Sequence, residues 1–175
     1  MSKRKILILF LDIIAIIVLI AADQYTKYLA VIHLKDKSAF SLINGILELN
    51  YLENKGAAFG MLQNQKVFFI FVAIVILCVI AYILYKTPDK KKYYLMHVLL
   101  SLIAAGAIGN MLDRIRLDYV VDFIYIVWIN FPIFNVADMY VSFATVFLII
   151  SLLFYYEESD LSFVSFHQKR YREIK

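Results

Sequence analysis

The sequence predicts an α-helical integral membrane protein, with four transmembrane helices and a small β-sheet platform on the outer side of the membrane. The first observation is composition: of 175 residues, 63% are hydrophobic and 18% are charged, which is too apolar for a soluble domain of this size. The second is the presence of four apolar stretches close to the length of about 20 residues that a helix needs to cross a bilayer, namely 6–22, 67–85, 95–112 and 139–156. We expect a single domain over 1–175, ending in a charged tail over 157–175.

The N-terminal stretch has some features of a cleaved signal peptide. A basic start precedes an apolar run, and Ala21 and Ala22 follow that run. However, Asp12 interrupts the run, the stretch is long, and three further spans come after it. We therefore interpret it as an uncleaved membrane anchor.

The distribution of basic residues predicts the orientation, because Lys and Arg near span ends are retained on the cytoplasmic side. The third connection holds only Arg114 and Arg116, whereas the two ends of the chain and the second connection are rich in basic residues. Both termini are thus expected to be cytoplasmic. The net charge of +4 reflects this topology and requires no nucleic-acid partner. The basic residues are Lys3, Arg4, Lys5, Lys86, Lys90, Lys91, Lys92, Lys169, Arg170, Arg172 and Lys175.

The first outer connection predicts a β-hairpin. It has a turn signal at Asn44-Gly45, followed by the near-alternating run ILELNYL. The next segment, from Asn54 through Gly56 to Gly60, is rich in small residues. It is either a plain turn or a place where backbone lies close to a ligand or another strand.

Polar residues stand near the outer ends of two spans. Asp23 and Lys27 are four residues apart and share one helical face. The pair is either a helix-end ion pair with a snorkelling lysine or a polar group that fixes a substrate's backbone. Asn110 lies at membrane depth and needs a polar partner. For Asp113 we expect a partner in the adjacent Arg114 or another nearby base.

Two aspartates lie in apolar surroundings further along the chain. Asp122 is the centre of the run VVDFI, which predicts a short strand, and no neighbour in sequence neutralises it. Asp138 opens the fourth span, and taken alone it reads as a helix N-cap. If the connection between them folds back, a carboxyl of raised pKa meets one held ionised by a helix terminus. That pair supplies the acid and base of an aspartic peptidase, which needs no serine, cysteine or metal.

Cysteine and histidine suggest no metal site and no cofactor. Cys78 is the only cysteine, so an internal disulfide or a cysteine cluster is impossible, and its place mid-span indicates an apolar filler. His33, His97 and His167 have no partner at metal-ligand spacing.

Five motifs, in this order on a four-span chain, resemble lipoprotein signal peptidase, also called signal peptidase II. They are Asp23-x-x-x-Lys27, Asn54-x-Gly56-x-x-Phe59, Gly109-Asn110-x-x-Asp113-Arg114, Val120-Val121-Asp122-Phe123 and Phe134-Asn135-x-Ala137-Asp138. Each motif is weak alone, but the combination is specific and covers nearly the whole chain.

The resemblance implies that Asp122 and Asp138 form a catalytic dyad in a bacterial cell-membrane protease. It further implies polar residues that orient the dyad, hold the substrate backbone or brace the site. The implied substrate is a prolipoprotein cut just before its diacylglyceryl-modified cysteine, near the outer face of the membrane. We expect membrane lipids around a monomeric enzyme. The implied support residues are Asp23, Lys27, Asn54, Gly56, Asn110, Asp113, Arg114 and Asn135.

The chain departs from the family pattern in two places. Relatives usually have a glycine shortly before Val-Val-Asp, so Asp118 must form that turn, which Asp tolerates better than most residues. The charged tail after Tyr156 carries no family motif.

Two other classes of protein compete with a peptidase. A membrane transferase would use Asp113, Asp118, Asp122 and Asp138 to hold Mg²⁺ against a lipid phosphate. A small transporter or assembly factor would use the acids as a proton relay.

Overall fold

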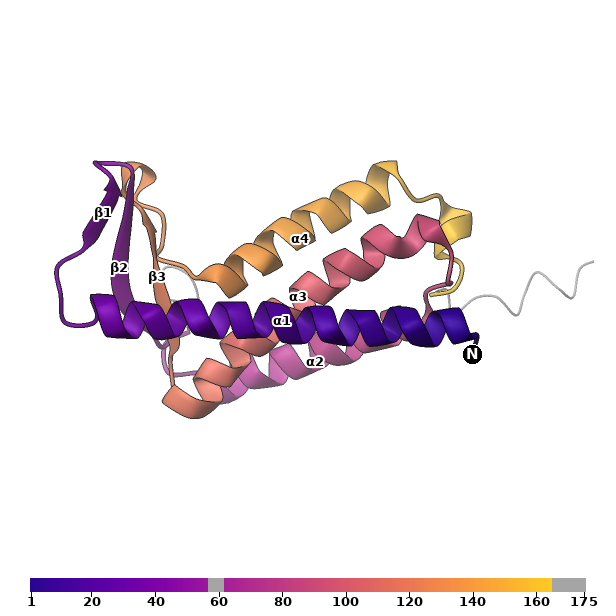
Figure 1. Cartoon of the computed structure of the whole chain (residues 1–175), viewed down its shortest axis with the longest axis horizontal. Helices are drawn as coiled ribbons and strands as arrows, with labels where there is room; N and C mark the ends of the chain where they lie inside the picture. The colour runs from indigo at the N-terminus through magenta and orange to yellow at the C-terminus, as the bar shows by residue number, and fades with distance from the viewer. Residues whose placement is uncertain (57–61, 165–175) are drawn as a thin grey trace, which may run out of the picture.

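The computed structural model describes residues 1–56 and 62–164. Four long helices lie side by side, and a three-stranded sheet stands across one end of the bundle (Figure 1). Within the described residues, all four helices are long and apolar enough to cross a membrane, which confirms the predicted fold class. The helices are α1 (Lys3–Leu34), α2 (Lys66–Lys86), α3 (Tyr94–Leu117) and α4 (Val136–Phe154).

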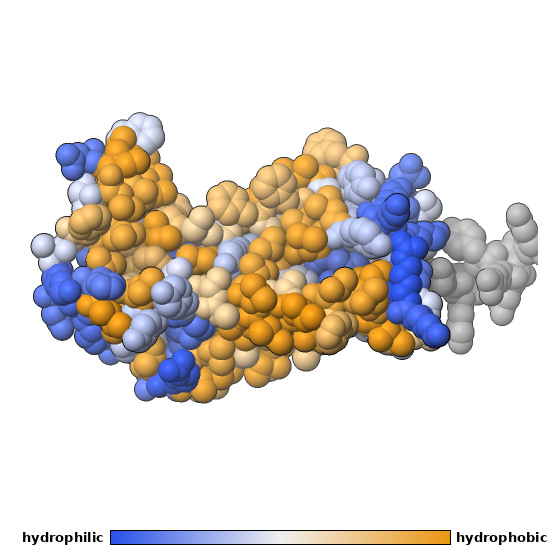
Figure 2. All heavy atoms as spheres, viewed as in Figure 1, coloured by the Kyte–Doolittle hydropathy of each residue, from blue (hydrophilic) through white to orange (hydrophobic). Residues whose placement is uncertain are grey.

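The surface agrees with a membrane-embedded bundle. Apolar side chains cover the sides of the helices, and hydrophilic side chains gather at the two ends (Figure 2). Ile17, Phe71 and Phe147 are all more than half exposed on their helices, although each is large and apolar. The centre of the bundle is α3, because half of its membrane-crossing segment is buried, against 11–17% for the other three helices.

The sheet is antiparallel, with strand order β1-β2-β3. Strands β1 (Phe40–Ile43) and β2 (Leu47–Asn54) form the predicted hairpin, and Gly45 in its turn adopts a φ of +71°. Strand β3 (Val120–Ile126) contains the VVDFI run and pairs with β2. Because Leu52 pairs with Asp122, the end of β2 lies beside the middle of the run.

Helix α1 extends well beyond the predicted span, which ended at residue 22. No glycine or proline interrupts it before it ends at Leu34. Its last two turns lie outside the apolar window and are stabilised by packing: Ala30 and Leu34 form a cluster with Val121 and Phe123 of β3. As a consequence, Asp23 and Lys27 occupy the body of the helix, facing its neighbours.

The turn between α3 and β3 forms at Asp118, as expected. Asp118 follows the last residue of α3 and takes the left-handed conformation, with a φ of +69°. Its carboxylate lies 2.6 Å from the ammonium of Lys66 at the start of α2. This turn points the chain directly into β3.

The other end of the bundle is closed by an apolar cluster. Tyr93, just before α3, stacks on Tyr156, with ring centroids 5.9 Å apart. Lys92 pairs with Asp160 of the C-terminal tail at 2.5 Å. The rest of the predicted charged tail, 165–175, lies outside the described residues.

One group within the spans differs from expectation, and another forms a pair that the sequence analysis did not predict. Cys78 is exposed on α2, so it faces the surroundings of the bundle and does not fill its core. His97 of α3 lies 2.7 Å from the carboxylate of Asp12, and both side chains are buried. This pair joins α1 to α3 far from the sheet.

Candidate active site

A cavity of about 490 Å³ lies where the sheet meets the helices. Asp122 and Asp138 both line it, and much of the remaining wall is aromatic or aliphatic. The cavity therefore presents two carboxyl groups to an otherwise apolar space. The lining residues are Asn54, Gly56, Phe69, Asn110, Arg114, Val120, Asp122, Phe131, Pro132, Ile133, Phe134, Asp138, Met139, Ser142 and Phe143.

Asp122 of β3 is almost completely buried, with 1% of its surface exposed. Asn54 donates to one carboxyl oxygen at 2.8 Å, and Asn135 donates to the other at 2.7 Å. Burial, followed by the nearby carboxylate of Asp138, raises the pKa of Asp122 to about 7, although the two amides and Lys27 oppose that rise. Asp122 therefore holds its proton well above the pH at which an exposed aspartate loses it.

Asp138 is the third residue of α4, so the reading of Asp138 as the N-cap is wrong. Asn135 is the cap: its side chain accepts the backbone N–H of Asp138 at 2.9 Å, and Asp138 accepts the backbone N–H of Asn135 at 3.1 Å. The second oxygen of Asp138 accepts from Asn110 at 2.7 Å. The capping box thus fixes the carboxylate of Asp138 at the helix terminus.

The amide of Asn135 connects the two aspartates. This side chain is fully buried, and its nitrogen donates to Asp122 and, at 3.1 Å, to the oxygen of Asn110. Asn110 in turn donates to Asp138. Because each amide has one accepting and one donating end, these contacts fix the orientation of both asparagines.

Lys27 is buried behind this pair, and the snorkelling interpretation is wrong. Its ammonium lies 2.9 Å from Asp23, from Asp113 and from the side-chain oxygen of Asn110. Three contacts use all three donors of an ammonium group. The side chains of Lys27, Asp23 and Asp113 have only 3%, 0% and 4% of their surface exposed, so the ions compensate one another in the interior.

Arg114 is not the partner of Asp113, because adjacent helical residues point in different directions. Its guanidinium lies over the ring of Phe69, 4.6 Å from the centroid, and donates to the carbonyl oxygen of Gly56 at 3.2 Å. The backbone N–H of Gly56 donates to Asn54 at 2.9 Å. Arg114 and Gly56 therefore form part of the cavity wall. Residues 57–61 of the predicted small-residue segment, including Phe59, lie outside the described residues.

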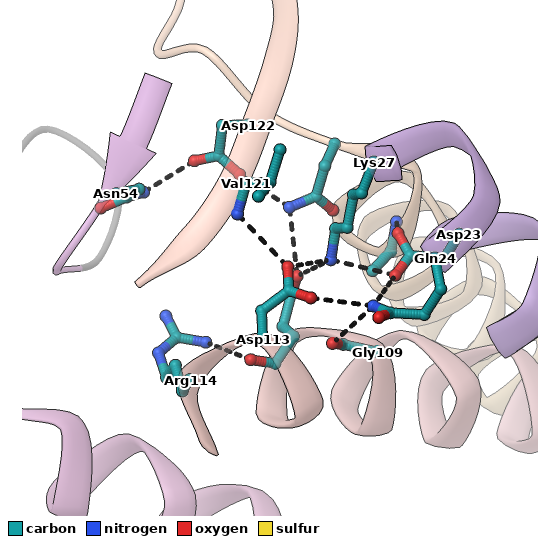
Figure 3. Close-up of polar contacts among 12 residues, drawn as sticks. Asp23, Gln24, Lys27, Asn54, Gly109, Asp113, Arg114, Val121 and Asp122 are labelled. Atoms are coloured by element: carbon teal, nitrogen blue, oxygen red, sulfur yellow. Dashed lines mark hydrogen bonds and ion pairs between the residues drawn. The ribbon is translucent and has the colours of Figure 1, made fainter. Parts of the chain in front are cut away.

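All of the residues predicted for the site are thus brought into one hydrogen-bonded network. The sequence analysis missed Gln24, whose amide nitrogen donates to Asp113 at 2.9 Å and lies 3.3 Å from both Asp23 and the carbonyl oxygen of Gly109 (Figure 3). Its signal was present in the sequence, since a glutamine in a membrane helix needs a polar partner just as Asn110 does.

Two glycines of α3 allow the helices to come close. A Cβ atom at Gly109 would lie 2.5 Å from the carboxylate of Asp23, and one at Gly106 would lie 2.5 Å from the carbonyl oxygen of Ala137. The absence of side chains at these two positions therefore brings α1 and α4 onto α3.

Two carboxyl groups, one buried and one partly buried, are each hydrogen-bonded through both oxygens and open to an apolar cavity in a membrane bundle, and this arrangement is that of an aspartic peptidase of the membrane-embedded class. Comparisons with known proteins identify the particular family. The family described as signal peptidase (SPase) II matches residues 14–154. The chain belongs to the signal peptidase II family.

Individual relatives agree with this assignment. A lipoprotein signal peptidase of Caldanaerobacter subterraneus subsp. tengcongensis is 43% identical over 130 residues, which cover 74% of this chain and 86% of the relative. One from Streptococcus agalactiae serotype Ia is 41% identical over 157 residues, covering 90% and 97%. The protein is therefore an endopeptidase that removes signal peptides from prolipoproteins, in a multi-pass membrane setting.

Solved structures support the fold. A bacterial membrane enzyme structure determined by the in meso method at 2.3 Å resolution superposes with a TM-score of 0.72 at 34% identity, covering 81% of this chain and 87% of that chain. A second, at 1.9 Å resolution, gives a TM-score of 0.71 at 34% identity and covers 83% and 94%.

Proposed function

We propose that Asp122 and Asp138 are the catalytic dyad of this signal peptidase, with Asp122 as the acid and Asp138 as the base. The observation that carries the proposal is their shared environment: both line one apolar cavity, and one amide network joins them. The proton of the resting pair belongs to Asp122, whose pKa burial raises to about 7. Asp138 sits in the first turn of a helix, where its two oxygens accept hydrogen bonds from Asn110 and from the backbone N–H of Asn135.

The proposed reaction uses water as the nucleophile. Asp138 takes a proton from the water while its oxygen attacks the scissile carbonyl carbon, and Asp122 gives its proton to the carbonyl oxygen. The resulting gem-diol collapses when Asp138 protonates the leaving nitrogen and Asp122 takes back a proton from a hydroxyl. The C–N bond breaks, and both aspartates return to their starting states without a covalent enzyme adduct.

We propose that the substrate is a prolipoprotein whose cysteine already carries a diacylglyceryl group, cut just before that cysteine. Phe69, Phe131 and Phe143 give the cavity an apolar wall next to the two carboxyl groups. A second hollow, of about 310 Å³, lies between α2, α3 and α4 and shares Asn110, Arg114 and Asp138 with the first. These surfaces suit a scissile bond flanked by an apolar signal helix and by acyl chains.

In the proposed topology both termini and the connection between α2 and α3 are cytoplasmic, and the sheet and cavity are at the outer face. The basic residues around Lys86 and Lys90 support this orientation. In a Cys78→Ser background, the thiol of Lys90→Cys should be protected from an impermeant thiol reagent in intact cells. Labelling at this position would contradict the proposed orientation and indicate the opposite one. We further propose that the enzyme acts as a monomer and binds no nucleic acid.

The competing transferase lacks the group of converging carboxylates that it would need. Asp113 faces Lys27 and Asp118 faces Lys66, so these carboxylates do not converge with Asp122 as a magnesium-dependent transferase requires. The family assignment, moreover, is that of a peptidase.

The test uses purified protein and a synthetic or purified prolipoprotein, with and without the diacylglyceryl group. Mass spectrometry should find a single cut before the cysteine in the lipidated substrate only. Asp118→Asn is a matched control, since Asp118 is an exposed aspartate on the same connection, and it should cleave as the parent does. Equal cleavage of the unlipidated substrate, or a cut elsewhere, would contradict the proposed specificity.

A further inference from the structure

The backbone next to each dyad aspartate is held by a second, buried carboxylate. The N–H of Val121, immediately before Asp122, donates to Asp113 at 3.2 Å. The N–H of Ala137, immediately before Asp138, donates to Asp23 at 2.9 Å. Val121 and Ala137 are as buried as the acids that hold them, so these hydrogen bonds are shielded from water.

Two side chains of α1 tie these carboxylates to each other. Lys27 lies 2.9 Å from both Asp23 and Asp113, and Gln24 donates to Asp113 at 2.9 Å and lies 3.3 Å from Asp23. Figure 3 shows Lys27 and Gln24 between the two acids, with Val121 pointing at Asp113. A continuous polar chain therefore runs from the residue before Asp122, through α1, to the residue before Asp138.

None of the four side chains that form this polar connection lines the cavity. They are Asp23, Gln24, Lys27 and Asp113. Gln24 and Lys27 face away from the space that a substrate occupies, behind the strand and helix that carry the dyad. Gln24 reaches the dyad through backbone, whereas Lys27 also donates to the side chain of Asn110, which in turn donates to Asp138. A change in Gln24 should consequently alter how the carboxyls are placed without altering the surface that binds the substrate, whereas a change in Lys27 also removes a partner of Asn110 in the cavity wall.

We propose that Gln24 is a positioning residue that, together with the already implied support residue Lys27, sets the separation of the two catalytic carboxyls through this double backbone clamp. The proposal rests on the proposed dyad. Gly109 supports it, because any side chain there would displace the carboxylate of Asp23 that holds Ala137. Reacting groups must be placed to within a fraction of an ångström, and misplacement by about 1 Å can cost about a hundredfold in rate.

The experiment compares Gln24→Met, Lys27→Met and the matched control Tyr28→Met. Tyr28 is on the same helix with 60% of its surface exposed. Cleavage is measured per folded enzyme, quantified from the monodisperse peak in size-exclusion chromatography. Gln24→Met should lower kcat about tenfold and Lys27→Met about a hundredfold, both with KM within about twofold of the parent. Tyr28→Met should match the parent in both constants.

A pH profile distinguishes positioning from a purely structural role. Gln24→Met changes no charge, so a shift in the basic limb of kcat/KM reports a change in how Asp122 is placed relative to the groups that set its pKa, among them Asp138. We expect the limb to move to lower pH, because carboxyls freed from the clamp separate and Asp138 then raises the pKa of Asp122 less.

The proposal would be overturned if folded Gln24→Met kept the kcat of the parent and the basic limb of its kcat/KM profile did not shift. A rise in KM with unchanged kcat would also overturn it. Lys27→Met need not fold for this test, since Gln24→Met retains every charge. The dyad assignment is tested separately by Asp122→Asn. If that variant stays active, the dyad assignment is wrong. If Asp122→Asn is inactive and Gln24→Met behaves like the parent, only the clamp proposal is wrong.

Discussion

Substitution of Asp122 by asparagine should remove a specific pH dependence of stability. The unfolded chain titrates this carboxyl at its ordinary pKa of 3.8, and the folded protein titrates it at about 7. Between these values the folded protein keeps a proton that the unfolded chain has lost, so stability decreases as pH rises. At 1.36 kcal/mol per pKa unit, the parent loses about 4 kcal/mol by pH 7 relative to pH 4.

The variant lacks this titrating group, so its stability should decline by about 4 kcal/mol less than that of the parent over the same window. For a chain of this length, about 4 kcal/mol corresponds to a fall in Tm of roughly 8–16 °C in the parent. The assay is the fraction of detergent-solubilised protein that stays monodisperse after heating, measured at half-unit steps from pH 4 to pH 8.

Asp118→Asn is a control in which the lost carboxyl affects the pH dependence of stability in the opposite direction. Lys66 lowers the pKa of the exposed Asp118 carboxyl, so the stability that Asp118 contributes is lost only as pH falls below its ordinary range. Its substitution should leave the decline above pH 4 intact. If Asp122→Asn declines from pH 4 to pH 7 as steeply as the parent, then Asp122 does not hold the proton of the pair, and the division into acid and base is wrong.

Three further predictions concern the site. The value of kcat/KM should fall above about pH 7 as Asp122 loses its proton, and a rate that keeps rising to pH 9 would contradict this. Gly109→Ala should lower the free energy of unfolding by about 1–3 kcal/mol, since its Cβ would meet Asp23; an unchanged Tm would show that the helices yield easily. Because the proposed chemistry uses carboxyls and water, EDTA should leave cleavage unchanged, and a loss reversed by Mg²⁺ or Zn²⁺ would indicate a metal-dependent enzyme.

Local sequence signals predicted the helices, the hairpin and the two aspartates. Hydropathy located the spans, and Asn44-Gly45 located the turn, because both depend on nearby residues alone. The same signals set the end of the first span too early, since hydropathy reports the membrane boundary and α1 continues past it by packing on β3. The N-cap error arose between two residues that both cap helices well. The spacing of Asn135 and Asp138 is that of a capping box, which identifies Asn135 as the cap.

Contacts between residues far apart in the sequence could not be predicted from local sequence signals. Lys27 meets Asp113 across 86 positions of the chain only because α1 packs against α3, and periodicity places both on inner faces without pairing them. The pairing of Asn54 with Asp122 likewise depends on the register of β2 against β3. Gln24 was overlooked because its neighbours Asp23 and Lys27 already seemed to satisfy each other.

The dyad is tested most directly by the cleavage rates of Asp122→Asn, Asp138→Asn and the double variant on lipidated prolipoprotein. Each variant is purified in folded form and compared with the parent and with Asp118→Asn. Asparagine preserves the size of the side chain but cannot exchange the proton, so all three should lose activity by at least about a thousandfold. The double variant should be no worse than either single one, because the two residues act as a unit. Near-parental turnover in a folded Asp122→Asn or Asp138→Asn enzyme would remove that residue from the catalytic pair.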